Sequence, residues 1–256
     1  MRLAAALFST LLVFFAIRFL PEKGFLIFLI SLMPMFLAES ASMAADSVIN
    51  SVCIIASAYI LSLTRSEEKL RTSQIITLIL ISVIIGLLKQ VYGTIMLMYF
   101  LIPYKRLGSI RRYILFGIIL LALCLASALT WTYLSVVRVK AASGFASKAN
   151  PVEQLKFFVA NPILVFKIMI KSNVMRLKFY AESFIGVLGW LTLKMPIWFY
   201  LFYGLMLIIG GLSGRIKIFW WQRFLMIAGC LATLLGMDFV MYFTWNPPGA
   251  FSCEGI

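Results

Sequence analysis

Two charged residues next to apolar runs are the first candidates for chemistry in this sequence. Asp46 precedes the apolar run 48–63, and Lys89 separates two short runs, 74–88 and 91–102. An acid at the start of an apolar helix either caps that helix or faces a metal ion or a phosphate. A lysine at a helix bend either binds a phosphate or extends its ammonium group to the membrane surface. We predict Asp46 and Lys89 as supporting residues of a site, without assigning the catalytic base.

The remaining acids and the absent residue types narrow the chemistry further. Glu39 lies close to Asp46 in the sequence, so the two carboxylates could share a divalent cation, but this spacing is unspecific and no metal site is assigned. Asp238 falls inside the apolar run 224–243 and is expected to pair or to face a cavity. The chain has no histidine, which excludes catalytic triads and imidazole zinc sites from these residues.

A basic segment, residues 138–195, supplies the candidates for substrate binding. Apolar residues recur there at three to four positions and alternate with lysines, which is typical of amphipathic helices that lie in the headgroup plane. Lys156, Glu182 and Trp190 are the predicted substrate-binding residues, on a platform for a lipid-linked phosphate. The alternative is plain electrostatic adhesion of the segment to anionic lipid.

Composition places these residues in a membrane protein. Hydrophobic residues make up 63% of the 256, charged residues make up 12%, and the mean hydropathy is +1.02, whereas soluble domains are about half apolar and a quarter charged. We predict an all-α polytopic bundle with about eight membrane segments, two of them short, and an outer-face amphipathic loop. The apolar runs are 3–17, 24–38, 48–63, 74–88, 91–102, 113–137, 196–213 and 224–243.

The distribution of positive charge predicts which ends of these segments share a side. The net charge of +14 comes from lysines and arginines dispersed at the ends of apolar runs, which indicates lipid headgroups as the partner and no nucleic acid. If 74–102 forms two short helices, twelve basic residues fall in short loops on one side, the inner one by the positive-inside rule. The predicted divisions are N-terminal helices 1–137, an extracytoplasmic loop 138–195, and a helical hairpin with an outer tail 196–256. This arrangement puts Met1 outside, so we expect a further segment upstream.

Three segments resemble a known family. They are Ser31-Leu32-Met33-Pro34-Met35, Phe184-Ile185-Gly186-Val187-Leu188-Gly189-Trp190, and Trp245-Asn246-Pro247-Pro248-Gly249. They resemble the bacterial predicted membrane protein family called domain of unknown function 2142. The resemblance covers most of the chain and implies an architecture similar to the GT-C glycosyltransferases, which use polyprenyl-phosphate sugars at an outward-facing site of the cell membrane.

Within that resemblance, Asp46 occupies the position of a second outer-loop acid, and Gly86-Leu87-Leu88-Lys89 with Gly93 resembles a short-helix bend. The family normally begins with a helix and an acidic outer loop, and it continues past the end of this chain. The resemblance therefore implies that the chain is a fragment and that the catalytic acid lies outside it.

The leading hypothesis is a GT-C-like protein that transfers a sugar from a polyprenyl-phosphate donor to a cell-surface glycan. The alternatives are a transporter or flippase for lipid-linked glycans and a non-catalytic protein of envelope assembly. The sequence predicts no particular cofactor, sugar, acceptor or oligomeric state.

Overall fold

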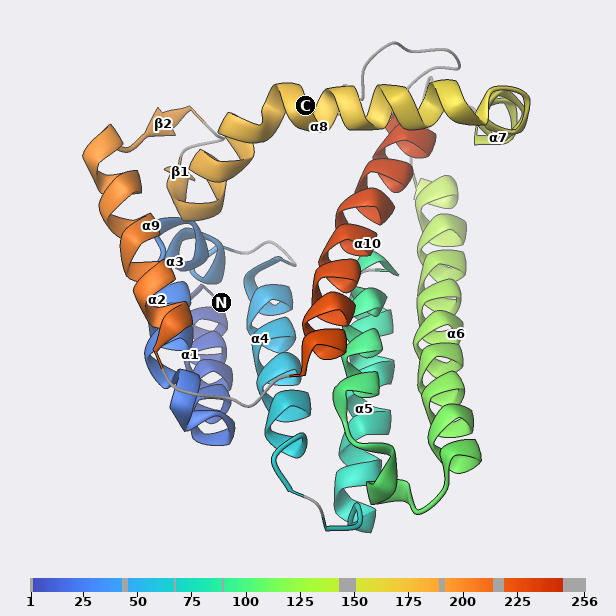
Figure 1. Cartoon of the computed structure of the whole chain (residues 1–256). Coiled ribbons are helices and arrows are strands. Elements are labelled where there is room, and N and C mark those ends of the chain that lie inside the picture. Colours follow the sequence, from blue (N-terminus) through green and yellow to red (C-terminus); the bar gives the residue numbers. More distant parts are fainter. Residues whose placement is uncertain are drawn as a thin grey trace.

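The computed structural model describes residues 2–42, 46–66, 68–88, 90–142, 151–188, 192–213 and 219–245. Nearly all of these residues are helical (Figure 1). The elements, in chain order, are α1 (Arg2–Phe19), η1 (Pro21–Lys23), α2 (Gly24–Ser31), α3 (Pro34–Ser40), α4 (Asp46–Leu63), α5 (Thr72–Leu88), η2 (Gln90–Leu101), η3 (Tyr104–Leu107), α6 (Ile110–Ala142), α7 (Pro151–Ala160), α8 (Pro162–Gly186), β1 (Val187–Leu188), β2 (Leu193–Lys194), α9 (Ile197–Leu212) and α10 (Trp220–Trp245).

Helices occupy all eight predicted apolar runs, and an all-helical membrane protein fits the structure. Within the part of the chain that the structure describes, three helices are long and apolar enough to cross a bilayer, namely α1, Ile110–Ser135 of α6 and Trp220–Val240 of α10. A bent pair, Pro21–Ser31 with Pro34–Ser40, adds a fourth span if the two halves cross together. Four shorter apolar helices complete the set, so the count of eight membrane segments stays a prediction.

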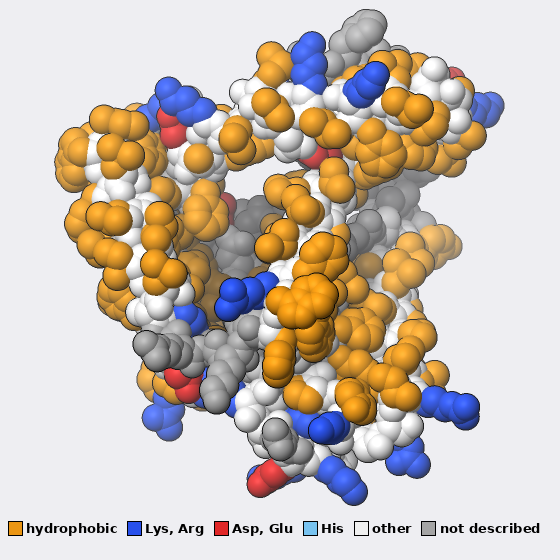
Figure 2. All heavy atoms as spheres, in the orientation of Figure 1, with side chains coloured by type: hydrophobic (Ala, Val, Ile, Leu, Met, Phe, Trp, Pro, Cys, Tyr) orange, Lys and Arg blue, Asp and Glu red, His pale blue; other side chains and the backbone are white. Residues whose placement is uncertain are grey.

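Apolar side chains cover the outside of the bundle (Figure 2). Leu212 and Trp220 are about four-fifths exposed, and large exposed hydrophobic residues occur on α1, α5, α6, α8, α9 and α10. A surface of this kind would aggregate in water, but hydrocarbon is its natural solvent. Among the described residues, polar contacts between helices include a bond between Ser9 and Ser51, a bond between Thr94 and Thr233, and a bond from Gln222 Nε2 to Leu101 O at 2.8 Å.

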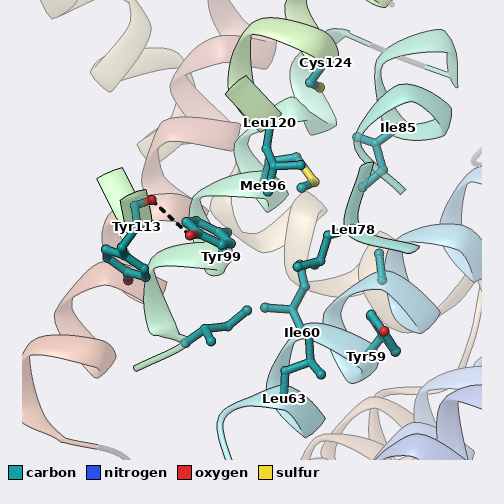
Figure 3. Close-up of a cluster of buried hydrophobic side chains, with 12 residues drawn as sticks. Tyr59, Ile60, Leu63, Leu78, Ile85, Met96, Tyr99, Tyr113, Leu120 and Cys124 are labelled. Atoms are coloured by element: carbon teal, nitrogen blue, oxygen red, sulfur yellow. Dashed lines mark hydrogen bonds between the residues drawn. The ribbon is translucent and has the colours of Figure 1, made fainter. Parts of the chain in front are cut away.

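The segment 72–101 forms two antiparallel helical pieces, as predicted, but the second piece is a 3₁₀ helix. At about 2.0 Å per residue, the twelve residues of η2 extend about 24 Å, farther than an α-helix of equal length. Its core cluster includes Tyr99, whose hydroxyl donates to Tyr113 O at 3.0 Å (Figure 3). Gly86 lets α5 approach α6 closely, since a Cβ there would lie 2.1 Å from Ser127 Oγ.

The apolar run 24–38, which was predicted as one membrane segment, does not form one continuous helix. It breaks at Leu32 and Met33 into α2 and α3, whose axes differ by 78°. Met33 adopts an extended conformation, with φ −56° and ψ 135°, because the ring of Pro34 disfavours the helical region for the residue before it. Pro34 then becomes the first residue of α3, where its missing N–H has no helical partner to lose.

The segment after α6 lies across one end of the bundle (Figure 1). α7 begins at Pro151, a residue type that favours the first turn of a helix, and α8 continues for 25 residues. Val165, Ile168 and Met169 of α8 are buried against Tyr242 of α10. The hairpin of β1 and β2, which the sequence analysis did not predict, connects α8 to α9. We call this the α8 end, and the opposite end, with η1, η3 and the loop 64–71, the basic end.

Candidate functional site

A cavity of about 620 Å³ lies directly beneath the C-terminal half of α8. Figure 2 shows this side of the molecule hollowed under α8, between α9 and α10. α2, α3, α4, α8 and α10 all contribute to its wall, which is mostly apolar, with Glu39, Asn50, Tyr180 and Ser183 as polar residues. This volume falls within the usual range of small-molecule sites, about 300–1,000 Å³. We call it the Glu39 cavity.

The polar centre of the cavity is a carboxylate–amide pair. Asn50 Nδ2 on α4 donates to Glu39 Oε2 on α3. The 78° bend before Pro34 turns α3 away from the axis of α2, and α3 packs against α4. A carboxylate accepts hydrogen bonds and the remaining amide groups donate or accept them, so the pair suits a ligand that carries hydroxyl groups.

α8 forms the roof of the cavity and is fixed at its C-terminal end by close packing. Phe179, Tyr180, Ser183 and Phe184 line the cavity from above. A Cβ on Gly186 would lie 2.9 Å from Pro34 Cβ, so only glycine lets the roof approach α3 this closely. Two of the segments that carry the family resemblance, around Pro34 and around Gly186, therefore contact each other at this site.

A hydrogen bond between α8 and α10 fixes the roof on the other side. Asn173 Nδ2 donates to Asp238 Oδ2, and it also donates to Met169 O at 3.0 Å. The expectation that Asp238 pairs inside the last apolar run is thus confirmed. An acid so near hydrocarbon requires such a partner, because an unpaired charge there is costly.

Glu182 is held by two lysines at the rim of the cavity. Lys194 Nζ lies 2.8 Å from Glu182 Oε2, and Lys178 Nζ lies 3.9 Å from Oε1. Hydrogen bonding from Lys194 lowers the pKa of Glu182, and the same bond raises the pKa of Lys194. Glu182 precedes the cavity-lining Ser183, so this ion pair connects the roof to the β1–β2 hairpin beside the cavity.

The structure separates the other predicted site residues. Lys156 is exposed on α7, at the far end of α8 from Glu182. Glu182 is twenty residues beyond Pro162 on α8, about 30 Å at 1.5 Å per residue, so Lys156 and Glu182 cannot hold one small headgroup together. Asp46 is the first residue of α4, on the helix that carries Asn50. Lys89 and Trp190 lie outside the described residues.

The sequence suggested Glu39 only as a possible metal ligand, together with Asp46. The pairing of Glu39 with Asn50, eleven residues later, requires the bend at Pro34 and the turn between α3 and α4. A useful signal was available in the sequence, since a proline after a long apolar run indicates a change of helix direction. Within the described residues, no group of three or more cysteine or acidic side chains is arranged to bind a metal ion.

Fold and surface together define a mostly helical membrane protein in which α8 lies across one end of the bundle above a cavity. All 256 residues match a family described as "Predicted membrane protein (DUF2142)", and the chain belongs to this family. This confirms the family resemblance noted from the sequence. No curated protein and no solved structure matches the chain.

Proposed function

We propose that the Glu39 cavity binds the sugar of a polyprenyl-phosphate-linked donor and that the protein takes part in GT-C-type glycosyl transfer in the bacterial cell membrane. The observation that carries the proposal is the position of a carboxylate–amide pair in a cavity roofed by an interfacial helix. Hydroxyl groups of a sugar would bond to Glu39 and Asn50, and the phosphate would remain at the membrane surface.

The basic face of α8 suits the phosphate. Lys167, Lys171 and Lys178 are exposed on α8, and Lys194 lies at the rim of the cavity. Cations at the bilayer surface attract anionic headgroups by about 1 kcal/mol each. In the proposed reaction Lys178 and Lys194, the two of these cations beside Glu182, stabilise the departing phosphate, and Asp46 and Lys89 keep the supporting roles predicted from the sequence.

An apolar crevice below the cavity suits the prenyl chain. Ile54 and Leu234 line the cavity, and Ser57 and Thr233, a turn or less away on the same helices, line a second hollow of about 220 Å³. This hollow is floored by Ile95, Leu97 and Met98 of η2. An isoprenoid tail in this crevice would bury apolar surface while its head stays under α8.

The proposed chemistry is displacement at the anomeric carbon. An acceptor hydroxyl loses its proton to a carboxylate as its oxygen bonds to that carbon, and the bond between this carbon and the phosphate oxygen breaks to release polyprenyl phosphate. Glu39 is the described carboxylate nearest to where the sugar would lie.

The test uses the full chain in lipid nanodiscs, with a polyprenyl phosphate and the matching polyprenol as ligands. Native mass spectrometry should detect retention of the phosphate form and much weaker retention of the polyprenol. Equal retention of the two ligands would contradict the proposal.

Transfer is then measured as release of polyprenyl phosphate from a radiolabelled lipid-linked sugar in membranes that contain glycan acceptors. Glu39→Gln should retain the lipid yet lose about 100-fold or more of the release rate if Glu39 is the base. Glu68→Gln, at the basic end, is the matched control. Retention of lipid with no release by the native protein would favour the transporter or scaffold alternatives.

A further inference from the structure

A second cavity lies at the basic end of the bundle. Its volume is about 360 Å³, and its wall includes Tyr59 and Ser62 of α4, Lys69 and Arg71 of the following loop, and Arg106 of η3. Ser62 is twelve residues beyond Asn50 on α4, which corresponds to about 18 Å along that helix. We call it the Arg106 cavity, and it is separate from the Glu39 cavity.

Arg106 carries a buried positive charge whose hydrogen-bond acceptors are neutral oxygens, which is unusual in proteins. Only 3% of the residue is exposed. Its Nε donates to Glu68 O at 2.6 Å, its Nη1 donates to Leu63 O, and its Nη2 donates to Gln74 Oε1 at 3.3 Å. Among the residues that the structure describes, no carboxylate lies within ion-pair distance of this guanidinium.

The cations around the cavity outnumber the described anions. Lys69 and Arg71 are exposed at its mouth, and Arg71 lies 3.8 Å from the exposed carboxylate of Glu68. Desolvation by burial lowers the pKa of Arg106, although the nearby carboxylate of Glu68 acts in the opposite direction. Buried charges in proteins are normally paired, so an anion in this cavity would supply the missing counter-charge.

We propose that the Arg106 cavity is a binding site for a phosphate group. Lys69 and Arg71 contact the phosphate oxygens, Ser62 and Ser66 lie within the same wall as hydroxyl partners, and Arg106 supplies positive potential from behind. Phe19 and Tyr59 form an apolar side on which a glycerol backbone can pack. The phosphate belongs either to an anionic phospholipid of the adjoining leaflet or to a small soluble phosphate ester, and the chemistry of recognition is the same.

This site does not depend on the proposed glycosyl transfer. It lies at the other end of α4 and uses none of the residues of the Glu39 cavity. The two proposals can therefore fail separately.

The test compares two double variants of the full chain that remove the same charge from the same end. Lys69→Gln with Arg71→Gln removes the two cations at the mouth of the cavity. Arg111→Gln with Arg112→Gln removes two exposed cations near the start of α6, which do not line the cavity. All four residues are exposed, so both variants should fold, and the single variant Lys69→Gln repeats the test if the double variant does not.

Each protein is placed in nanodiscs of phosphatidylcholine alone or with phosphatidylglycerol, and retained lipid is counted by native mass spectrometry. The native protein and the α6 variant should retain phosphatidylglycerol, and the cavity variant should bind it about tenfold or more weakly, because only this variant loses charge-assisted hydrogen bonds to the phosphate. Equal weakening in both double variants would overturn the proposal, because it would indicate general surface adhesion. No preference for phosphatidylglycerol and no response to a soluble phosphate would also overturn it.

A titration with glycerol 3-phosphate in phosphatidylcholine nanodiscs distinguishes the two sources of the phosphate. A rise in the thermal midpoint of the native protein that the cavity variant lacks would assign a soluble ester. Retention of phosphatidylglycerol without such a rise would assign the lipid headgroup.

Discussion

The two ends of this helical bundle enclose cavities of opposite chemical character. The Glu39 cavity has a mostly apolar wall around one carboxylate–amide pair, and an amphipathic helix covers it. The Arg106 cavity is formed by the ends of α1, α4 and α5 together with short loops, and three cations contribute to its wall. The first arrangement suits an uncharged, hydroxyl-rich group attached to a lipid, and the second suits an anion. One bundle thus contains two cavities that differ in the kind of ligand they suit.

Different interactions stabilise the two ends of the bundle. Removal of the Arg106 side chain should have the largest effect on the free energy of unfolding. Arg106→Met leaves Leu63 O and Glu68 O without their donor, and hydrogen bonds to a charged group contribute about 1.5–3 kcal/mol each. We expect the free energy of unfolding in detergent to fall by about 3 kcal/mol or more, measured by chemical denaturation. Lys105→Met, at the exposed neighbouring residue, is the control and should change it little. Equal effects of the two substitutions would show that the guanidinium does not hold the basic end together.

An intermediate effect is expected where the α8 roof meets α3. In Gly186→Val, the new Cβ would lie 2.9 Å from Pro34 Cβ, and overpacking of this kind costs about 1–3 kcal/mol. Gly204→Val places a side chain on α9 where a Cβ meets nothing within 4 Å, and it serves as control. Thermal unfolding gives the stability, and retention of polyprenyl phosphate reports the cavity. If Gly186→Val matches its control in both measurements, the roof is not fixed by this contact.

The smallest effect should come from pH at the rim of the Glu39 cavity. Because the pKa of Glu182 is lowered from its ordinary 4.5, the ion pair stabilises the fold above that value and is lost as pH falls through the lowered pKa. Because the pKa of Lys194 is raised from its ordinary 10.5, the stabilisation is also lost as pH rises through the raised pKa. Amide hydrogen exchange of residues 187–188 and 192–194, corrected for intrinsic rates, should show protection that declines at both extremes.

Lys194→Met should remove most of this pH dependence. Lys178→Met, whose ammonium group lies farther from Glu182, should retain it. A pH profile unchanged in Lys194→Met would contradict the assignment of the effect to this ion pair.

The sequence predicted correctly those features that depend on a single segment of the chain. The helices over the predicted apolar runs and the short pieces on either side of Lys89 follow from composition and charge within each segment. It failed at the break before Pro34, because the apolar run itself is continuous there and only the proline marks the change of direction.

The candidate site was predicted only in part. Glu182 lies at the rim of the Glu39 cavity, but its partner Lys194 comes from a hairpin that the sequence did not indicate. Lys156 is at the other end of α8, and the pairing of Glu39 with Asn50 was not foreseen. Each of these outcomes depends on how separate helices are oriented, which no single segment specifies.

The sequence by itself determined that this protein belongs in a bilayer, that it is helical and that its basic residues gather in short loops. These properties follow from each segment alone, since backbone groups in hydrocarbon must bond within the helix and charges must reach water. Only the tertiary structure decided which polar groups meet. Asn50 bonds Glu39, and Asn173 bonds Asp238. Arg106 donates to the carbonyl oxygens of Leu63 and Glu68. Helix bends and close glycine contacts bring these distant residues together.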